Sequence, residues 1–176
     1  MSTLSIDEML EQANTLYDSG ENLDQCFQLY QQIVDMDPEN GYAVNRLANC
    51  YNNGYGVDKD CAHADQLYRR AAELGSAAGQ YNLADSLRKA GDPECIVWYE
   101  KALENGDADG AYHLAKIYLA GELVPQNNAL AISYYERAVE MGDRDSMAGL
   151  AFCLLEGEVV AQDKERGAAL MQKSAE

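Results

Sequence analysis

Few residues of this chain are spaced for covalent or acid–base chemistry. Ser86 and Lys89 form a Ser-x-x-Lys tetrapeptide, the spacing at which a lysine can activate a serine nucleophile. Acylating enzymes that use this pair also carry Ser-Asp-Asn and Lys-Thr-Gly, and the sequence contains neither. Asp109 precedes His113 by one helical turn and could orient its imidazole, but a dyad also needs a nucleophile within reach. We therefore expect no catalytic residue, and a small hydrolase is the weaker alternative.

The cysteines do not form a pattern typical of a metal or redox site. Cys26, Cys50, Cys61, Cys95 and Cys153 include no Cys-x-x-Cys pair, so we expect neither a metal nor a cofactor. A thiol enzyme would depend on Cys61, which lies at a loop edge, and Cys50 is a remote possible disulfide partner for it. The first residues lack the features of a secretion signal, and no apolar stretch reaches the ~18 residues of a membrane span. The expected location is the cytoplasm, where thiols stay reduced.

A glycine-rich segment, YNNGYGVDKD at 51–60, raises the question of phosphate binding. A phosphate loop of the Walker type follows a strand and places Lys and Ser/Thr at the start of the next helix. Here a helix is expected before the loop, and Asp60 is expected to cap the helix after it. The equivalent loops, GELVPQN and GEVVAQD, lack the second glycine. We interpret the segment as a bend, pinned by inward-pointing Val57, Val124 and Val160.

The charge of the chain is strongly negative and unevenly distributed. The net charge is −17, and the first 45 residues contain nine carboxylates but no Lys or Arg. Such a surface repels nucleic-acid phosphates and anionic lipid, so neither partner is expected. The excess charge favours either plain solubility or attraction of a basic partner to the N-terminal end, and the sequence leaves both open.

The chain repeats itself. Residues 47–75 align with 114–142 at a constant offset of 67, and further copies begin at Leu83 and Leu150, each 36 residues after an earlier one. Internal periods of this length are typical of repeat proteins, in which each unit packs only on its neighbours. The first alignment pairs Leu47 with Leu114, Tyr51 with Tyr118, Gly54 with Gly121, Val57 with Val124, Ala64 with Ala131, Tyr68 with Tyr135 and Gly75 with Gly142.

Each repeat reads as two antiparallel helices, so the predicted fold class is all-α, an α-solenoid of about five helix pairs. Apolar residues recur at helical spacing in both halves. Asp60, Asn127 and Asp163 are predicted to cap second helices, and Asp92 with Pro93 is predicted to start the shortened third one. Most tyrosines are expected in the packed core, at 17, 30, 51, 68, 99, 118 and 135.

The pattern Leu-Ala-x-x-Tyr-x-x-Gly-x-x-Val-x-x-Asp/Asn-x-x-x-Ala-x-x-x-Tyr-x-x-Ala-x-x-x-Gly resembles the Sel1-like repeat, a relative of the tetratricopeptide repeat. The resemblance covers residues 41–176, while the first unit is closer to a plain tetratricopeptide repeat, with Pro38 in the terminal proline place. The third unit departs from it, with Leu87 and Ala90 where Tyr and Gly are expected. The resemblance implies one repeat domain over 1–176 with units at about 5–40, 41–76, 77–107, 108–143 and 144–176. It also implies a right-handed superhelix that serves as a non-enzymatic adaptor for other proteins.

By the same resemblance, the first helix of each unit would line a concave groove that binds a partner protein or peptide. The lysine clamp with which some relatives hold a C-terminal carboxylate is not expected, because Arg46, Arg88 and Lys116 are dispersed along the chain. Asn and Tyr on this face would suit a peptide backbone. The implied groove residues are Glu8, Glu11, Thr15, Tyr42, Asn45, Asn49, Asn52, Tyr81, Asp85, Arg88, Tyr112, Lys116, Leu119, Ala148, Phe152 and Leu155.

The leading hypothesis is a scaffold that binds another protein or peptide in this groove, with the acidic N-terminal unit attracting a basic segment of the partner. The alternative is an acidic inhibitor that imitates nucleic acid and blocks a basic partner. Leu170 and Met171 on the last helix would lie open unless something covers them, which predicts self-association or docking at the C-terminal end.

Overall fold

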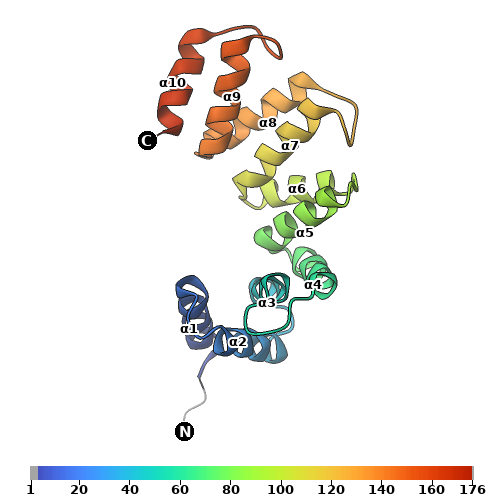
Figure 1. Cartoon of the computed structure of the whole chain (residues 1–176), viewed down its shortest axis with the longest axis vertical. Helices are drawn as coiled ribbons and strands as arrows, with labels where there is room; N and C mark the ends of the chain where they lie inside the picture. Colours follow the sequence, from blue (N-terminus) through green and yellow to red (C-terminus); the bar gives the residue numbers. More distant parts are fainter. Residues whose placement is uncertain (1–3, 176) are drawn as a thin grey trace. The chain divides into compact units, whose positions relative to one another are not determined.

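The computed structural model describes residues 4–175, which form ten α-helices and no β-strand (Figure 1). The all-α prediction is therefore confirmed. The helices follow one another as antiparallel pairs joined by short loops. They are α1 Ile6–Ser19, α2 Leu23–Met36, α3 Gly41–Asn53, α4 Cys61–Glu73, α5 Ala77–Lys89, α6 Cys95–Glu104, α7 Ala108–Ala120, α8 Asn128–Glu140, α9 Arg144–Glu156 and α10 Lys164–Ser174.

Side-chain caps fix most helix starts where the sequence predicts them. The carboxylate or amide oxygens of Asp60, Asn127 and Asp163 accept backbone N–H groups at the starts of α4, α8 and α10. The prediction for the third unit is wrong by two residues. Asp92 accepts the N–H of Glu94 at 2.9 Å and so closes a turn, and α6 begins only at Cys95.

The chain forms two compact units, one ending at Ser86 and the other beginning at Leu87 within α5. In the first unit α1 packs on α2, α3 packs on α4, and α2 joins the two hairpins by packing on α3. In the second unit α7 packs on α8 and α9 on α10, and the contacts of α6 with α7 and of α8 with α9 link these pairs. The predictions of one domain and of a right-handed superhelix stay predictions.

The core alternates large and small side chains. Tyr30 and Tyr99 are fully buried, and Ala64, Ala71, Ala131 and Ala138 at the crossing positions have no exposed surface, as their spacing indicates. One position near the start of the first helix holds a small residue in each of the four repeats over residues 41–176. It is taken by Ala43, Gly79, Gly110 and Ser146 in successive repeats.

Two of these small residues leave no room for a side chain. A Cβ on Gly79 would lie 2.7 Å from the Cβ of Ala71, and one on Gly110 would lie 2.8 Å from the carbonyl oxygen of Tyr99. Real Cβ atoms do not approach so closely, so the bare backbone at these sites sets how near each first helix comes to the preceding second helix.

The loop at 54–60 is a packed bend. Gly56 has a φ of +69°, and a Cβ placed on it would lie 2.6 Å from the carbonyl carbon of Leu23 at the start of α2. Beside it, the rings of Tyr55 and Tyr17 meet edge to face with centroids 5.6 Å apart. The second glycine, which suggested a phosphate loop, is thus explained by the close approach of two backbones. The loop that follows α7 carries Leu123 in the same place.

Gly56→Ala is expected to destabilise the chain more than Gly20→Ala. Both glycines have a φ of 69°, but a Cβ on Gly20 would meet no atom within 4 Å. Left-handed backbone strain, about 1 kcal/mol, is common to both variants. Overpacking adds about 1–3 kcal/mol at Gly56 alone. Urea unfolding followed by circular dichroism measures the difference, and equal losses of unfolding free energy would contradict the packing argument.

Ser146→Ala is expected to leave stability unchanged or to raise it by about 1 kcal/mol, because the buried hydroxyl of Ser146 has no hydrogen-bond partner among the described residues. Ala already fills this repeat position at Ala43. Ser133→Ala, which removes an exposed hydroxyl bonded to the Leu130 carbonyl, serves as the control in the same thermal unfolding experiment. A loss of stability at Ser146 larger than at Ser133 would show that the hydroxyl has a partner.

Candidate functional site

The residues expected to line a groove all lie on the first helix of a hairpin, but they belong to two units and are described separately for each. Their arrangement as one continuous groove stays a prediction. Glu8 and Glu11 are on α1, Tyr42, Asn45, Asn49 and Asn52 on α3, Tyr81, Asp85 and Arg88 on α5, Tyr112, Lys116 and Leu119 on α7, and Phe152 and Leu155 on α9.

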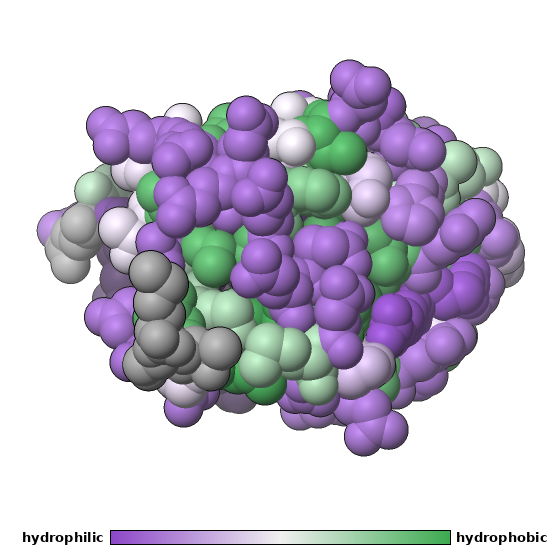
Figure 2. All heavy atoms as spheres, turned by 90° about the horizontal axis from the view of Figure 1, so that it is seen from below, coloured by the Kyte–Doolittle hydropathy of each residue, from purple (hydrophilic) through white to green (hydrophobic). Residues whose placement is uncertain are grey.

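In the first unit, α1 carries a shallow acidic hollow. A cavity of about 330 Å³ is lined by Glu8, Glu11, Gln12, Thr15 and Leu16, and the two glutamates are exposed. The backbone N–H and the hydroxyl of Ser5 donate to the Glu8 carboxylate at 2.8 and 3.0 Å, which holds the pKa of Glu8 below its ordinary value. The face seen from below Figure 1, on the side of the N-terminus, is covered mainly by hydrophilic residues (Figure 2).

The asparagines of α3 are not displayed for a ligand in the way expected. Asn45 is only 3% exposed, and its side-chain oxygen accepts the amide of Asn82 on α5 at 2.8 Å. The oxygen of Asn49 accepts the Tyr68 hydroxyl at 2.7 Å and the same Asn82 amide at 3.4 Å. The assignment of Asn45 to a ligand-contacting face is therefore corrected, because this side chain bonds two helices to each other. Asn52 is half-buried at the end of the same helix.

Tyr42 and Arg46 of α3 form a second cluster of side chains, which is held in contact with residues of α1. Tyr42 is 39% exposed. Its hydroxyl donates to the Asn14 side-chain oxygen at 2.7 Å and accepts from Arg46 Nε at 2.9 Å. The Arg46 guanidinium lies 4.7 Å from the ring centroid of Tyr17 and 5.1 Å from that of Tyr42. Arg46 is thus held by aromatic faces.

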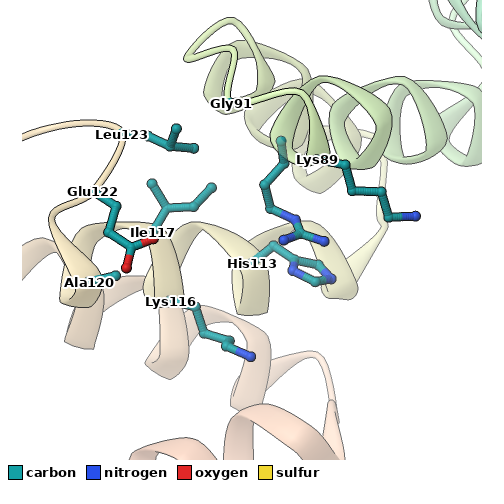
Figure 3. A pocket seen from close by; sticks show the side chains of 9 residues that line it. Lys89, Gly91, His113, Lys116, Ile117, Ala120, Glu122 and Leu123 are labelled. Atoms are coloured by element: carbon teal, nitrogen blue, oxygen red, sulfur yellow. The ribbon is translucent and has the colours of Figure 1, made fainter.

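In the second unit, the end of α5 and the exposed side of α7 enclose a hollow of about 400 Å³ (Figure 3). Arg88 and Lys116, which the sequence suggested were too dispersed to act together, both line it, together with Lys89 and His113. That expectation is wrong for this pair because the chain turns back through α6 between them. Arg46 belongs to the first unit. His113, Lys116 and Ile117 follow the i, i+3, i+4 spacing of one helical face, a signal that could have identified His113 from the sequence.

Aromatic rings hold the basic groups of this hollow in place. Arg88 Nε donates to the Tyr99 hydroxyl at 3.3 Å, and the Tyr99 ring stacks on His113 at 5.1 Å with an interplanar angle of 14°. On the other side of His113, the Tyr112 ring lies edge-on at 5.4 Å. Lys116 Nζ is 5.0 Å from the Tyr112 centroid and 3.4 Å from its hydroxyl oxygen. Basic and aromatic side chains therefore alternate from α5 to the middle of α7.

The remaining groove residues differ in their surroundings. Leu119 and Tyr112 are half-buried against a core cluster that contains Leu150 and Tyr135. Leu155 is half-buried and lies so close to α10 that a Cβ on Gly167 would be 2.9 Å from its Cγ. Phe152, by contrast, is 62% exposed. Ala148, Tyr81 and Asp85 are half-buried.

Ser86 and four of the five cysteines considered for catalysis are engaged elsewhere or buried, whereas Cys61 is exposed. The Ser86 hydroxyl donates to the Asp65 carboxylate at 2.6 Å. Burial raises the pKa of the Cys50 thiol to about 12, and it also raises the pKa values of Cys26, Cys95 and Cys153, so none of the four is a reactive thiolate at neutral pH. Over residues 4–175, no three His, Cys, Asp or Glu side chains are placed to hold a metal ion. In the same range, no helix has the length and apolar character needed to cross a bilayer.

Comparison with known proteins places the chain in a family. The sequence pattern of the Sel1 repeat matches residues 41–76, 77–107, 108–143 and 144–176. The chain belongs to the Sel1 repeat family. Over 68 aligned residues it is 40% identical to the Sel1-repeat-containing protein YjcO of Escherichia coli K12. The alignment covers 36% of this chain and 30% of YjcO. Over 82 aligned residues it is 32% identical to the uncharacterized protein NMB1327 of Neisseria meningitidis. This alignment covers 47% of this chain and 18% of NMB1327.

The fold is shared with a solved structure. The crystal structure of a Sel1 repeat protein from Oxalobacter formigenes superposes with a TM-score of 0.87 at 24% identity, covering 97% of this chain and 72% of that one. The chain spans less than a third of the length of the two relatives matched by sequence. Sel1 repeats generally mediate protein–protein interaction and typically form non-enzymatic scaffolds.

Asn45→Ala is expected to destabilise the first unit by about 1–3 kcal/mol, because it leaves the half-buried Asn82 amide without its closest acceptor. The matched control is Asn53→Ala, an exposed asparagine on the same helix, for which a change within about 0.5 kcal/mol is expected. Urea denaturation of the two variants makes the comparison. Equal stability of both would mean that Asn45 is available to contact a ligand after all.

Proposed function

We propose that this chain is a scaffold that binds another protein, with the acidic hollow on α1 receiving a basic segment of that partner. The observation that carries the proposal is the combination of Glu8 and Glu11, both exposed in one hollow, within a 45-residue stretch that has no Lys or Arg. The charged side chains of this stretch are all carboxylates, so they attract a basic peptide. Leu16 and Thr15 add surface for the aliphatic stem of a Lys or Arg side chain.

The ionisation state of the hollow suits this role. The hydrogen bonds from Ser5 favour the charged form of Glu8, so its carboxylate stays ionised at pH values well below neutrality. Each carboxylate has oxygen atoms that can accept from an ammonium or guanidinium group. The contact is exposed to solvent, which predicts modest affinity that decreases as ionic strength rises.

A second candidate, an inhibitor that imitates nucleic acid, draws support from the net charge of −17. Mimicry uses the electrostatic field of the whole acidic surface, whereas the proposed site uses two particular carboxylates.

The cytoplasm remains the proposed location, supported by five cysteines that are all unpaired. Self-association through the α9–α10 hairpin also stays a prediction. It is supported by Phe152 and Met171, which are 62% and 41% exposed.

The double variant Glu8→Gln with Glu11→Gln is expected to weaken binding of a short peptide of alternating lysine and alanine by about threefold to tenfold. Glutamine at position 8 can keep the capping box of α1, so the helix is retained. Isothermal titration at low and high salt measures the effect on the full chain, with a serine–alanine peptide as the neutral probe.

The matched control is Asp35→Asn with Glu39→Gln, which removes two exposed carboxylates from the same unit but outside the hollow. Unchanged binding by this control supports the hollow on α1. An equal loss in both double variants would favour the acidic mimic over a defined site. Absence of any binding by the wild-type chain would overturn the proposal.

A further inference from the structure

One exposed position is apolar in three of the first four hairpins. It lies six residues after the buried tyrosine of the second helix, which is Tyr30, Tyr68, Tyr99 or Tyr135. The residues at this position are Met36, Leu74, Asn105 and Met141. Met36, Leu74 and Met141 are 59%, 37% and 41% exposed. A single exposed apolar side chain is ordinary, but its return at one place in the repeat calls for a reason.

Helix capping does not require an apolar residue at this position. Beyond Leu74, the Ser76 N–H donates to the Ala71 carbonyl at 3.0 Å, and the intervening Gly75 has a φ of +83°. This is a Schellman motif, which needs the glycine and leaves the residue before it at the surface. The helix α6 ends in the same way with the polar residue Asn105 in that place. The apolar side chains are therefore not explained by the cap.

In the first unit, two of these side chains lie at one edge, where α2 and α4 end. The Arg70 guanidinium of α4 donates to the Pro38 carbonyl just beyond α2, which joins the two helix ends. Leu74 lies against the start of α3, since a Cβ on Gly41 would be 3.1 Å from the Leu74 Cβ. Met36 is the last residue of α2. We call the surface formed by Met36, Pro38 and Leu74, all exposed, the apolar edge.

Negative charge surrounds the apolar edge. The carboxylates within three residues of Met36 or Leu74 in the sequence are Asp35, Asp37, Glu39 and Glu73, and the same windows contain no Lys or Arg. The ends of α2 and α4 add the partial negative charge of a helix C-terminus. Met141 differs, because the exposed Arg144 lies three residues after it. The apolar edge of the first unit thus favours a basic neighbour, and Met141 offers a comparison.

We propose that the apolar edge binds a segment of a partner protein in which one large aliphatic side chain has lysine or arginine on both sides. The aliphatic side chain packs between Met36 and Leu74, and the flanking cations pair with the surrounding carboxylates. Methionine suits this contact because its flexible, polarizable side chain adapts to what it meets. The inference rests on the proposed function in one respect, that the partner is a basic protein segment. Its surface is separate from the hollow on α1.

The test follows methionine methyl signals by NMR in the full chain. Met36 reports on the apolar edge, and Met141 and Met171, each 41% exposed in the second unit, are internal references. The probes are acetyl-Lys-Lys-Leu-Lys-Lys-amide, the same peptide with alanine in place of leucine, and acetyl-Ser-Ser-Leu-Ser-Ser-amide. We expect the lysine–leucine peptide to shift Met36 saturably, the other two to bind about tenfold more weakly, and both references to stay constant. Equal shifts of all three methionines, or equal binding of the alanine peptide, would overturn the inference.

Leu74→Gln is expected to weaken the binding of the lysine–leucine peptide about tenfold, read through Met36, because it removes one side of the apolar contact. Met141→Gln changes the same repeat position in the second unit and is the matched control, with unchanged affinity expected. Glu73→Gln, an exposed change that the fold should tolerate, is expected to weaken binding about threefold and to reduce its salt dependence. Wild-type affinity in both Leu74→Gln and Glu73→Gln would overturn the inference.

The inference and the proposed function can fail separately. A lysine–alanine peptide has no large apolar side chain to hold it at the edge, so it reports on the hollow of α1 even though Asp35 and Glu39 lie beside the edge. In the chain that carries Glu8→Gln and Glu11→Gln, the lysine–leucine peptide is expected to shift Met36 as in the wild type. Loss of that response would overturn the inference. A retained response, with no binding of the lysine–alanine peptide to the wild type, would contradict the α1 proposal alone.

Discussion

Every part of this structure depends on the fact that no helix pair can bury its apolar stripe by itself. Each hairpin needs the next one, and the distance between them is set where a first helix crosses the preceding second helix. At these crossings the chain uses fully buried alanines together with Gly79 and Gly110, where an added Cβ would meet atoms of the preceding helix. Tyrosines fill the space beside them. The packing of one helix pair on the next thus depends on small residues at a few positions as much as on buried apolar side chains at others.

Polar side chains on the first helices have two different uses. In the first unit, some of them join helices. Asn82 donates to both Asn45 and Asn49, and Asn14 accepts from Tyr30 and Tyr42. A buried amide used in this way cannot also recognise a peptide, because its hydrogen bonds are already made. The carboxylates of Glu8 and Glu11 on α1 and the ammonium group of Lys116, by contrast, stay at the surface.

The two hollows differ in sign, and the difference has a local cause. Glu8 and Glu11 of α1 lie in a stretch of 45 residues without Lys or Arg, and the basic residue that packs on α1 is Arg46, over the Tyr17 ring. Around α7 the turn through α6 brings the basic end of α5 beside Lys116, and stacked tyrosines hold both groups.

The sequence by itself determined the helices and their order, because these depend on local signals. Apolar spacing marks each helix, and Asp60, Asn127 and Asp163 cap the helices that follow them. Where a local signal was ambiguous, at Asp92, the helix start was misplaced by two residues. Only the tertiary structure decided the role of Asn45 and the meeting of Arg88 with Lys116. Their partners come from helices many residues away, and the period of one helix carries no information about which side chain of another helix will face it.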